Sequence, residues 1–302
     1  MAGAIDRIKE RADAFQREHG PAGFVFAVVK KAGDDKGSQL AALITYYGFF
    51  SLFPLLLVAF TILGFVLQHN PSVRDDVATT LQQRLPLPGI SADSINGSGF
   101  ALVIGVLLTL WSGLGATQVA QDALNTVWDV PRTKQPTFVK KRLVGLGILA
   151  VIGLGLIAAT AASSLSGFLG PAAGVGGVAA SVVLNTLVIA MLFKLMVERD
   201  LTWAEIRVGA FVGGVGWAAL QLIGSWYTQR LVDNADKTYG TFAVVIGLLS
   251  WIYLQSQVFI YAAEVASVSS RRLWPRALVA DRPTDADRKV ELALVERSKP
   301  AS

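Results

Sequence analysis

Four polar side chains share one face of the most C-terminal apolar segment of the chain. Ser250, Gln257, Tyr261 and Glu264 are spaced by seven, four and three residues, which is the repeat of one helical face. In a lipid bilayer no water hydrogen-bonds such groups, so the face is expected to turn toward other helices or a wet cavity. These residue types could hydrogen-bond a polar ligand, and Glu264 could exchange a proton or an ion.

Glu264 has two interpretations, and both stay open. A charged side chain at the bilayer centre costs about 2.5–3.5 kcal/mol, and less near the interface. In the functional interpretation the carboxylate takes up and releases a proton. In the structural interpretation it pairs with a base on another helix, for which Lys194 and Arg142 are the candidates, and the pair holds the bundle together.

A second polar stripe consists of Gln118, Asp122 and Asn125, spaced by four and three residues. It ends the second apolar segment, at the same predicted depth as Glu264. The two stripes could therefore line one cavity that opens to the cytoplasm. The alternative is a helix that leaves the membrane, with Asp122 in solvent.

The first apolar segment carries hydroxyl groups on its inner half, at Thr45 and Tyr46, and a proline, Pro54. Proline cannot donate a hydrogen bond to the carbonyl of Phe50, and its ring crowds that carbonyl, so a kink is predicted. A bent helix with hydroxyl groups suits the wall of a cavity, although an irregular bundle would contain the same residues.

Composition requires that these faces belong to a membrane protein. Of the 302 residues 53% are hydrophobic and 16% are charged, whereas a soluble domain has about 25% charged residues. Six apolar stretches are long enough to span a bilayer, which takes about 20 residues as a helix. They are Gln39–Leu67, Phe100–Ala120, Leu143–Ser166, Val175–Phe193, Ile206–Tyr227 and Thr241–Val268.

The basic residues predict the orientation of this six-helix, all-α bundle. All but four of the 27 Lys and Arg residues fall on one side of the predicted spans; the exceptions are Arg74, Arg84, Arg230 and Lys237. By the positive-inside rule both termini are cytoplasmic. The basic excess is then a signal of topology, and a nucleic-acid partner is not expected.

The sequence divides into three consecutive segments. Residues 1–38 form an N-terminal segment in which Ile5, Ile8, Ala12 and Phe15 recur at helical spacing, typical of an amphipathic helix on the membrane surface or against the cytoplasmic loops. Residues 39–268 form the transmembrane domain, with an outer-loop helix predicted between residues 70 and 86. Residues 269–302 form a charged tail, expected to be mobile, with a short helix at Asp285–Arg297.

Catalytic chemistry finds little support. The chain has no cysteine, and its two histidines, His19 and His69, lie outside the apolar segments. A metal-dependent hydrolase needs several clustered His and carboxylate ligands, and no phosphate-binding glycine motif occurs. We therefore expect no cofactor, no metal and no enzymatic activity.

Three stretches together resemble the YihY/virulence factor BrkB family. The first is Ala41–Tyr47 continued by Ser51–Leu55, and the second is Ala123–Trp128. The third combines Tyr239–Thr241, Leu248–Tyr253 and Ala263–Glu264, and the resemblance covers about residues 24–268. One departure is Ala262, where the family often has glycine before Ala-Glu.

This resemblance implies a six-helix protein of the bacterial inner membrane, linked to envelope integrity and to passage of lipids or glycolipids. It also carries an older label, ribonuclease BN, which the scarcity of metal ligands argues against. The leading hypothesis is a transporter or flippase-like protein for an amphiphilic lipid or glycolipid. Its cavity would lie between the first, second and sixth spans, with Glu264, Asp122 and Gln118 as the polar wall.

Two alternatives stay open. One is a scaffold that transports nothing and binds lipids or envelope-assembly proteins, and the other is an ion or small-solute channel. In each case the expected partners are membrane lipids, anionic phospholipid or glycolipid, and a homo-oligomer is compatible with the sequence.

Overall fold

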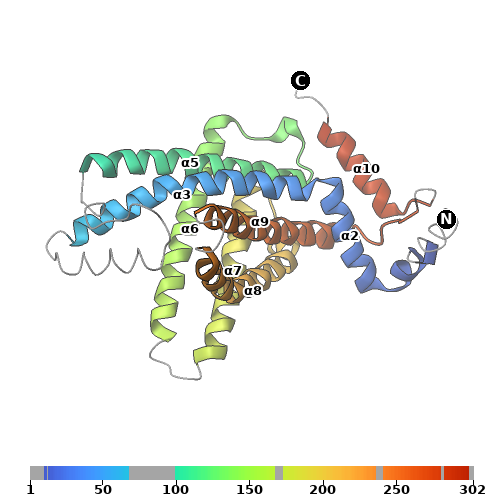
Figure 1. The fold of residues 1–302 in the computed structure, drawn as a ribbon. Helices are drawn as coiled ribbons and strands as arrows, with labels where there is room; N and C mark the ends of the chain where they lie inside the picture. The colour runs from blue at the N-terminus through green and yellow to red at the C-terminus, as the bar shows by residue number, and fades with distance from the viewer. Residues whose placement is uncertain are drawn as a thin grey trace. The chain divides into compact units, whose positions relative to one another are not determined.

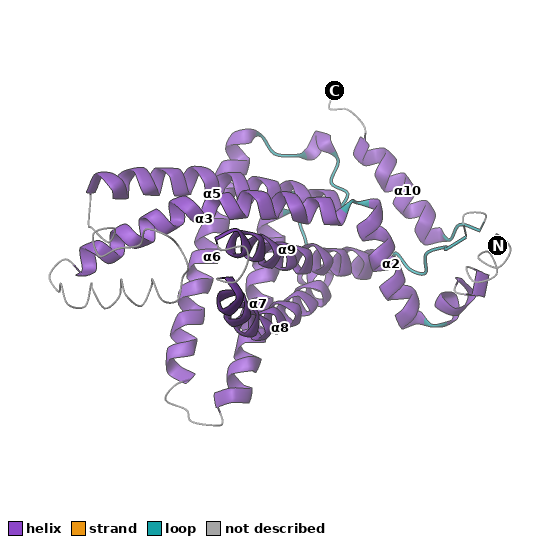
Figure 2. Cartoon of the chain, viewed as in Figure 1, coloured by secondary structure: helices purple, strands orange, loops and turns teal. Residues whose placement is uncertain are grey.

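The computed structural model describes residues 10–11, 13–67, 99–166, 173–235, 241–279 and 282–298, and within them the chain is helical, without strands. Figures 1 and 2 show the helices and the loops that join them. The helices are α2 (Gly20–Asp34), α3 (Gly37–Leu67), α5 (Gly99–Val127), α6 (Phe138–Ser166), α7 (Ala173–Met196), α8 (Trp203–Ala235), α9 (Thr241–Arg271) and α10 (Asp285–Ser298), with a short 3₁₀ turn η2 (Arg132–Lys134). The predicted outer-loop helix lies outside the described residues.

Five of these helices are long and apolar enough to cross a membrane. The spans are Gly37–Val58, Leu102–Val127, Gly176–Met196, Trp203–Gly224 and Val245–Arg271. The helix α6 coincides with the predicted third span but is not among the five. An all-helical protein with several membrane-crossing helices is thus confirmed, while the count of six and the cytoplasmic location of both termini stay predictions.

Pro54 lies inside α3, and the helix continues past it to Leu67. The Ser51 hydroxyl donates a hydrogen bond of 2.7 Å to the carbonyl of Gly48. It therefore does not bond the carbonyl of Phe50, the group that a proline at position 54 deprives of its helical donor. The kink itself stays a prediction.

The fold gathers the chain into two compact units. Unit 1 comprises Met1–Ala41, Ala120–Ala218 and Gln257–Ser302, and unit 2 comprises Ala42–Val119 and Ala219–Ser256. The helices α3, α5, α8 and α9 each contribute residues to both units. The three consecutive segments of the sequence analysis do not match this grouping, because the N-terminal segment and the tail belong to the same unit.

Glycines bring the helix backbones close together inside each unit. In unit 1 a Cβ atom on Gly209 of α8 would lie 2.2 Å from the carbonyl oxygen of Ala262 on α9, and one on Gly214 would lie 2.2 Å from Oγ1 of Thr186 on α7. In unit 2 a Cβ on Gly224 would lie 2.6 Å from the Trp251 ring. Small residues at helix crossings permit this approach.

The tail packs within unit 1 and does not match the expectation of a mobile segment. Leu273 and Val290 belong to a hydrophobic core with Val28 of α2 and Val265 and Val268 of α9. The predicted tail helix is present as α10, one residue longer than expected. The sequence analysis treated the charges of the tail as solvated, whereas several of them are paired.

The N-terminal segment also contacts the tail. Asp13 and Gln16 are buried while Phe15 is exposed. The Gln16 side chain donates to the carbonyl of Arg276, and the Leu278 amide donates to Asp13 at 2.7 Å. The described part of the segment therefore packs against the tail. Ile5, Ile8 and Ala12 lie outside the described residues, so the amphipathic helix stays a prediction.

Gly209→Ala is expected to destabilise unit 1, because the new methyl group would overlap the backbone of α9 at Ala262. Overpacking of this kind costs about 1–3 kcal/mol. Thermal unfolding in detergent, followed by circular dichroism, measures the change. The matched control is Gly153→Ala in α6, where a Cβ atom meets nothing within 4 Å. Equal melting temperatures for the two variants would contradict the packing argument.

Candidate functional site

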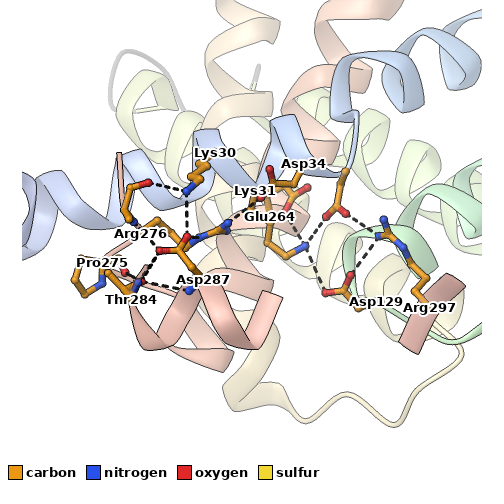
Figure 3. A network of polar contacts seen from close by, with 12 residues as sticks. Lys30, Lys31, Asp34, Asp129, Glu264, Pro275, Arg276, Thr284, Asp287 and Arg297 are labelled. Carbon is orange, nitrogen blue, oxygen red and sulfur yellow. Dashed lines mark hydrogen bonds and ion pairs between the residues drawn. The ribbon is translucent and has the colours of Figure 1, made fainter. Parts of the chain in front are cut away.

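Glu264 is fully buried, and its charge partner is Lys31. The side chain of Glu264 is 0% exposed and that of Lys31, on α2, is 1% exposed. The Lys31 Nζ atom lies 3.4 Å from Oε2 of Glu264 (Figure 3). The sequence analysis named Lys194 and Arg142 as candidate partners, and this was wrong because the closest cation comes from a helix that precedes the first predicted span.

Two more carboxylates surround the same ammonium group. Lys31 Nζ lies 2.5 Å from Oδ2 of Asp35, one helical turn further along, and 3.8 Å from Oδ2 of Asp129. It also donates to the carbonyl of Val127 at 2.7 Å. Asp129 lies in the loop after α5 with φ of 51°. One ammonium group thus joins three segments that are distant in the sequence.

Two arginines complete this group. Arg271 Nη1 lies 2.6 Å from Oδ2 of Asp129. Arg297 Nη1, from the last turn of α10, lies 2.7 Å from Oδ1 of Asp35, 3.2 Å from Oδ1 of Asp129 and 2.7 Å from the carbonyl of Thr126. The six residues are called the buried ion cluster, and its three cations and three anions balance: Lys31, Asp35, Asp129, Glu264, Arg271 and Arg297.

The cluster keeps Lys31 charged. Burial alone would lower the pKa of the Lys31 ammonium, but the carboxylates of Glu264, Asp35 and Asp129 raise it above its ordinary value. Glu264 accepts no hydrogen bond from the described residues, so its carboxylate is held by the charge of Lys31. This arrangement favours the structural interpretation of Glu264, since the side chain faces an ion pair inside unit 1 and not an open cavity.

A second polar group in unit 1 fixes the tail through Asp287 (Figure 3). Asp287 Oδ1 lies 2.6 Å from Arg276 Nε and 3.0 Å from Lys30 Nζ. Its Oδ2 accepts from the Ala277 amide at 2.8 Å and from the Thr284 amide at 3.0 Å. Burial raises the pKa of Asp287, but the hydrogen bonds from Arg276, Thr284 and Ala277 outweigh it and hold the pKa well below its usual range.

The second polar stripe does not join Glu264 in one cavity. Asn125 is buried, and its Oδ1 accepts a 2.8 Å hydrogen bond from the Glu198 amide, so it caps the turn after α7. Asp122 is half exposed and pairs with Lys141 at 2.5 Å. Gln118 belongs to unit 2, where its Nε2 is buried with no acceptor among the described residues. Asp122 thus matches the alternative of an exposed acid.

Unit 2 contains an open groove lined by hydroxyl groups. It has a volume of about 300 Å³, and its lining comes from α3 and α9. We call it the hydroxyl groove, and its lining residues are Ala42, Thr45, Tyr46, Leu249, Ser250 and Tyr253. The Thr45 hydroxyl also donates to Oγ of Ser256 at 3.3 Å. Of the predicted cavity residues the groove unites Thr45, Tyr46 and Ser250, whereas Gln257 and Tyr261 belong to unit 1.

An aromatic stripe continues from this groove along α3. Tyr46, Phe50 and Phe53 follow each other at four and three residues, and each is more than half exposed. The ring centroids of Tyr46 and Phe50 are 4.8 Å apart, and those of Phe50 and Phe53 are 6.3 Å apart. The hydroxyl groove therefore adjoins a continuous apolar surface through Tyr46, which belongs to both.

Sequence reasoning missed most of the buried ion cluster. It placed Lys31 and Asp35 in a cytoplasmic segment, and Arg271 and Arg297 in a mobile tail. The one available signal was the spacing of four between Lys31 and Asp35, a typical helical ion pair, beside the apolar run at residues 24–29.

Lys31→Met is expected to lower the free energy of unfolding strongly. The change would leave Asp35, Asp129 and Glu264 buried without their shared cation, and removing one partner of a buried ion pair costs about 3–5 kcal/mol. The double variant Lys31→Met/Glu264→Gln should recover part of this loss, because one uncompensated charge is gone. Chemical denaturation of the full chain measures the free energy of unfolding of Lys31→Met, of Glu264→Gln and of the double variant. The exposed Lys194→Met is the control. If the double variant lowered the free energy of unfolding by the sum of the two single-variant effects, the pairing would be contradicted.

Acid is expected to weaken the contacts that Asp287 makes with the rest of the tail. Because the pKa of Asp287 is lower in the folded chain than in the unfolded chain, its contribution is present at neutral pH and declines below about pH 4, where an unfolded aspartate takes up a proton. Hydrogen exchange of residues 276–290, corrected for the intrinsic rate, should therefore accelerate in acid. In Asp287→Asn this acid dependence should be lost, whereas the exposed control Asp285→Asn should keep it. An unchanged pH profile in Asp287→Asn would refute the assignment.

Comparison with known proteins identifies the family to which the chain belongs. The family model described as Virulence factor BrkB matches residues 28–286. The inner membrane protein YhjD of Escherichia coli is 24% identical over 90% of this chain and 88% of its own length. A ribonuclease-like protein of Bacillus subtilis, YfkH, is 26% identical over 80% of this chain and 91% of its own length.

A UPF0761 membrane protein of Pseudomonas paraeruginosa is 26% identical over 86% of this chain and 66% of its own length. No solved structure matches the chain. The family model covers most of the chain, including the hydroxyl groove and all of the buried ion cluster except Arg297. With five apolar helices able to cross a bilayer, the chain is a membrane protein and belongs to the Virulence factor BrkB family.

Proposed function

We propose that the protein binds an amphiphilic lipid of the bacterial inner membrane in the hydroxyl groove and moves it between the two leaflets. The observation that carries the proposal is the groove itself. Thr45, Tyr46, Ser250 and Tyr253 bring four hydroxyl groups to a space of about 300 Å³ between membrane-crossing helices. Lipid tails cannot hydrogen-bond such groups, whereas a polar ligand can.

The residues of the groove suit a lipid headgroup. A hydroxyl group both donates and accepts hydrogen bonds, so those of the exposed residues Tyr46 and Ser250 can bind phosphate, glycerol or sugar oxygens without a fixed charge. The adjoining aromatic stripe of Tyr46, Phe50 and Phe53 offers an exposed apolar surface along which an acyl chain would lie. The groove and the stripe together match the two halves of an amphiphile.

In this proposal Glu264 supports the fold and does not line the transport path. Its pairing with Lys31 supports this assignment. The three carboxylates that meet at Lys31, those of Asp35, Asp129 and Glu264, already bind its ammonium group and are not available to a metal. We therefore also propose that the protein is not an enzyme. The word ribonuclease in the name of YfkH describes that protein.

A scaffold that transports nothing is the second candidate. The observation in its favour is the firmly held tail, whose polar contacts run through Asp287, Arg276 and Arg297. Such a unit would present a fixed surface to partner proteins of the envelope.

The test is movement of fluorescent phospholipid and glycolipid analogues in reconstituted vesicles. The variant Tyr46→Phe/Ser250→Ala removes two hydroxyl groups of the groove and keeps the exposed side chains close in size. Because a hydrogen bond contributes about 0.5–1.5 kcal/mol, the rate should fall about fivefold or more. The matched control is Tyr47→Phe/Ser112→Ala, which removes the same two kinds of hydroxyl from residues that do not line the groove.

Equal rates in the two double variants would exclude the groove as the path. Absence of movement in the folded wild-type protein, across a panel of headgroups, would favour the scaffold.

A further inference from the structure

Two cations of unit 1 lie over exposed aromatic rings. Lys194 Nζ, in the last turn of α7, is 4.8 Å from the ring centroid of Trp203, the first residue of α8. The Arg142 guanidinium, in the first turns of α6, is 4.6 Å from the ring of Phe138. Trp203 is 54% exposed and Phe138 is 64% exposed. Cation–aromatic contacts of this length are attractive. Each aromatic residue nevertheless keeps more than half of its surface exposed.

One pair lies where α6 begins, and the other lies where α7 ends and α8 begins. The Lys140 side chain, at the start of α6, forms an ion pair with Glu198 in the turn that follows α7. This contact joins the segment that carries Phe138 and Arg142 to the turn between Lys194 and Trp203. The helices α6 and α7 also lie side by side (Figure 1). We call Phe138, Arg142, Lys194 and Trp203 the headgroup surface.

Apolar side chains begin directly beside this surface. Val139 and Leu143 on α6 and Met191 and Leu195 on α7 are all exposed. Lys194 lies within the last three residues of the candidate span Gly176–Met196, and Trp203 begins the next one, Trp203–Gly224. The boundary between the hydrocarbon and the polar headgroups of a bilayer is therefore expected at these residues of unit 1. Tryptophan and snorkelling lysine side chains are enriched at this level of a bilayer.

Several of the acidic groups at this end are already neutralised. Glu198 pairs with Lys140, and Glu205 pairs with Arg199 at 2.6 Å and accepts from the Thr202 amide at 2.8 Å. Lys194 forms no ion pair with any residue in the part of the chain that the structure describes. Its positive charge lies beside the Trp203 ring and is paired with no carboxylate of the described residues.

We propose that the headgroup surface binds the phosphate of an anionic phospholipid from the surrounding bilayer. Lys194 and Arg142 attract the phosphate, and Trp203 and Phe138 pack beside the glycerol and ester groups. Basic residues next to a membrane gain free energy from anionic lipid because the leaflet surface is negative. This binding requires neither the hydroxyl groove nor any movement of lipid, so it stands apart from the proposed function.

The experiment compares spin-labelled phosphatidylglycerol with spin-labelled phosphatidylcholine around the reconstituted full chain. Electron paramagnetic resonance gives the motionally restricted fraction of each lipid, and their ratio is the selectivity. Wild type should prefer phosphatidylglycerol. The variant Lys194→Gln/Arg142→Gln should lose up to about fivefold in affinity for each charge removed. The control Arg288→Gln/Lys289→Gln removes two exposed charges from α10, outside the candidate spans, and should keep the wild-type ratio.

The single variant Lys194→Gln separates loss of charge from misfolding. Lys194 is exposed, and its replacement leaves the packing of α6 intact. It should show the loss for one charge, and added salt should reduce the wild-type preference toward that of the variant. An unchanged ratio in Lys194→Gln, an equal loss in the α10 control, or no preference in wild type would overturn the proposal. Each of these results leaves the test of lipid movement unaffected.

Discussion

The ammonium group of Lys31 is the charge on which the described part of unit 1 depends. It is almost completely buried, and an isolated ammonium group there would be strongly unfavourable. The chain resolves this by bringing three carboxylates to it, from Asp35 directly after α2, from the loop after α5 and from α9. Because the carboxylates need further cations in turn, Arg271 and Arg297 are drawn in as well. The position of the tail follows from the balance of buried charge.

Glu264 shows what this constraint does to function. Its helix places it on one face with Ser250 and Tyr261, which suggested a single polar path through the membrane. The fold divides that face, so that Ser250 belongs to unit 2 while Tyr261 and Glu264 belong to unit 1. In the proposed function the groove residues that would contact a ligand therefore carry hydroxyls without a formal charge, which suits a ligand with its own charged or polar headgroup.

The extent of the helices could be predicted from the sequence because it depends on local properties. Hydropathy and length alone place α3, α7 and α9 close to their observed bounds, whereas α8 continues to Ala235, past its predicted end at Tyr227. The partner of Glu264 could not be predicted this way, since Lys31 lies far away in the chain and outside every span. Among the site residues, Thr45, Tyr46 and Ser250 do meet in one groove, whereas Asp122 pairs with Lys141 in half-exposed surroundings. The sequence of one helix shows whether its face is polar. It does not show which other element of the fold packs against that face.

The order of the cluster along the chain has a consequence for biosynthesis. Arg297 follows every other member, so it leaves the ribosome last, after α9 has been made. Until then Lys31 and Arg271 face Asp35, Asp129 and Glu264 with one negative charge in excess. The loop carbonyl of Thr126 also lacks its guanidinium donor at that stage. Unit 1 can therefore reach its neutral, fully packed state only after translation has passed the last turn of α10, which makes its completion a post-insertion step.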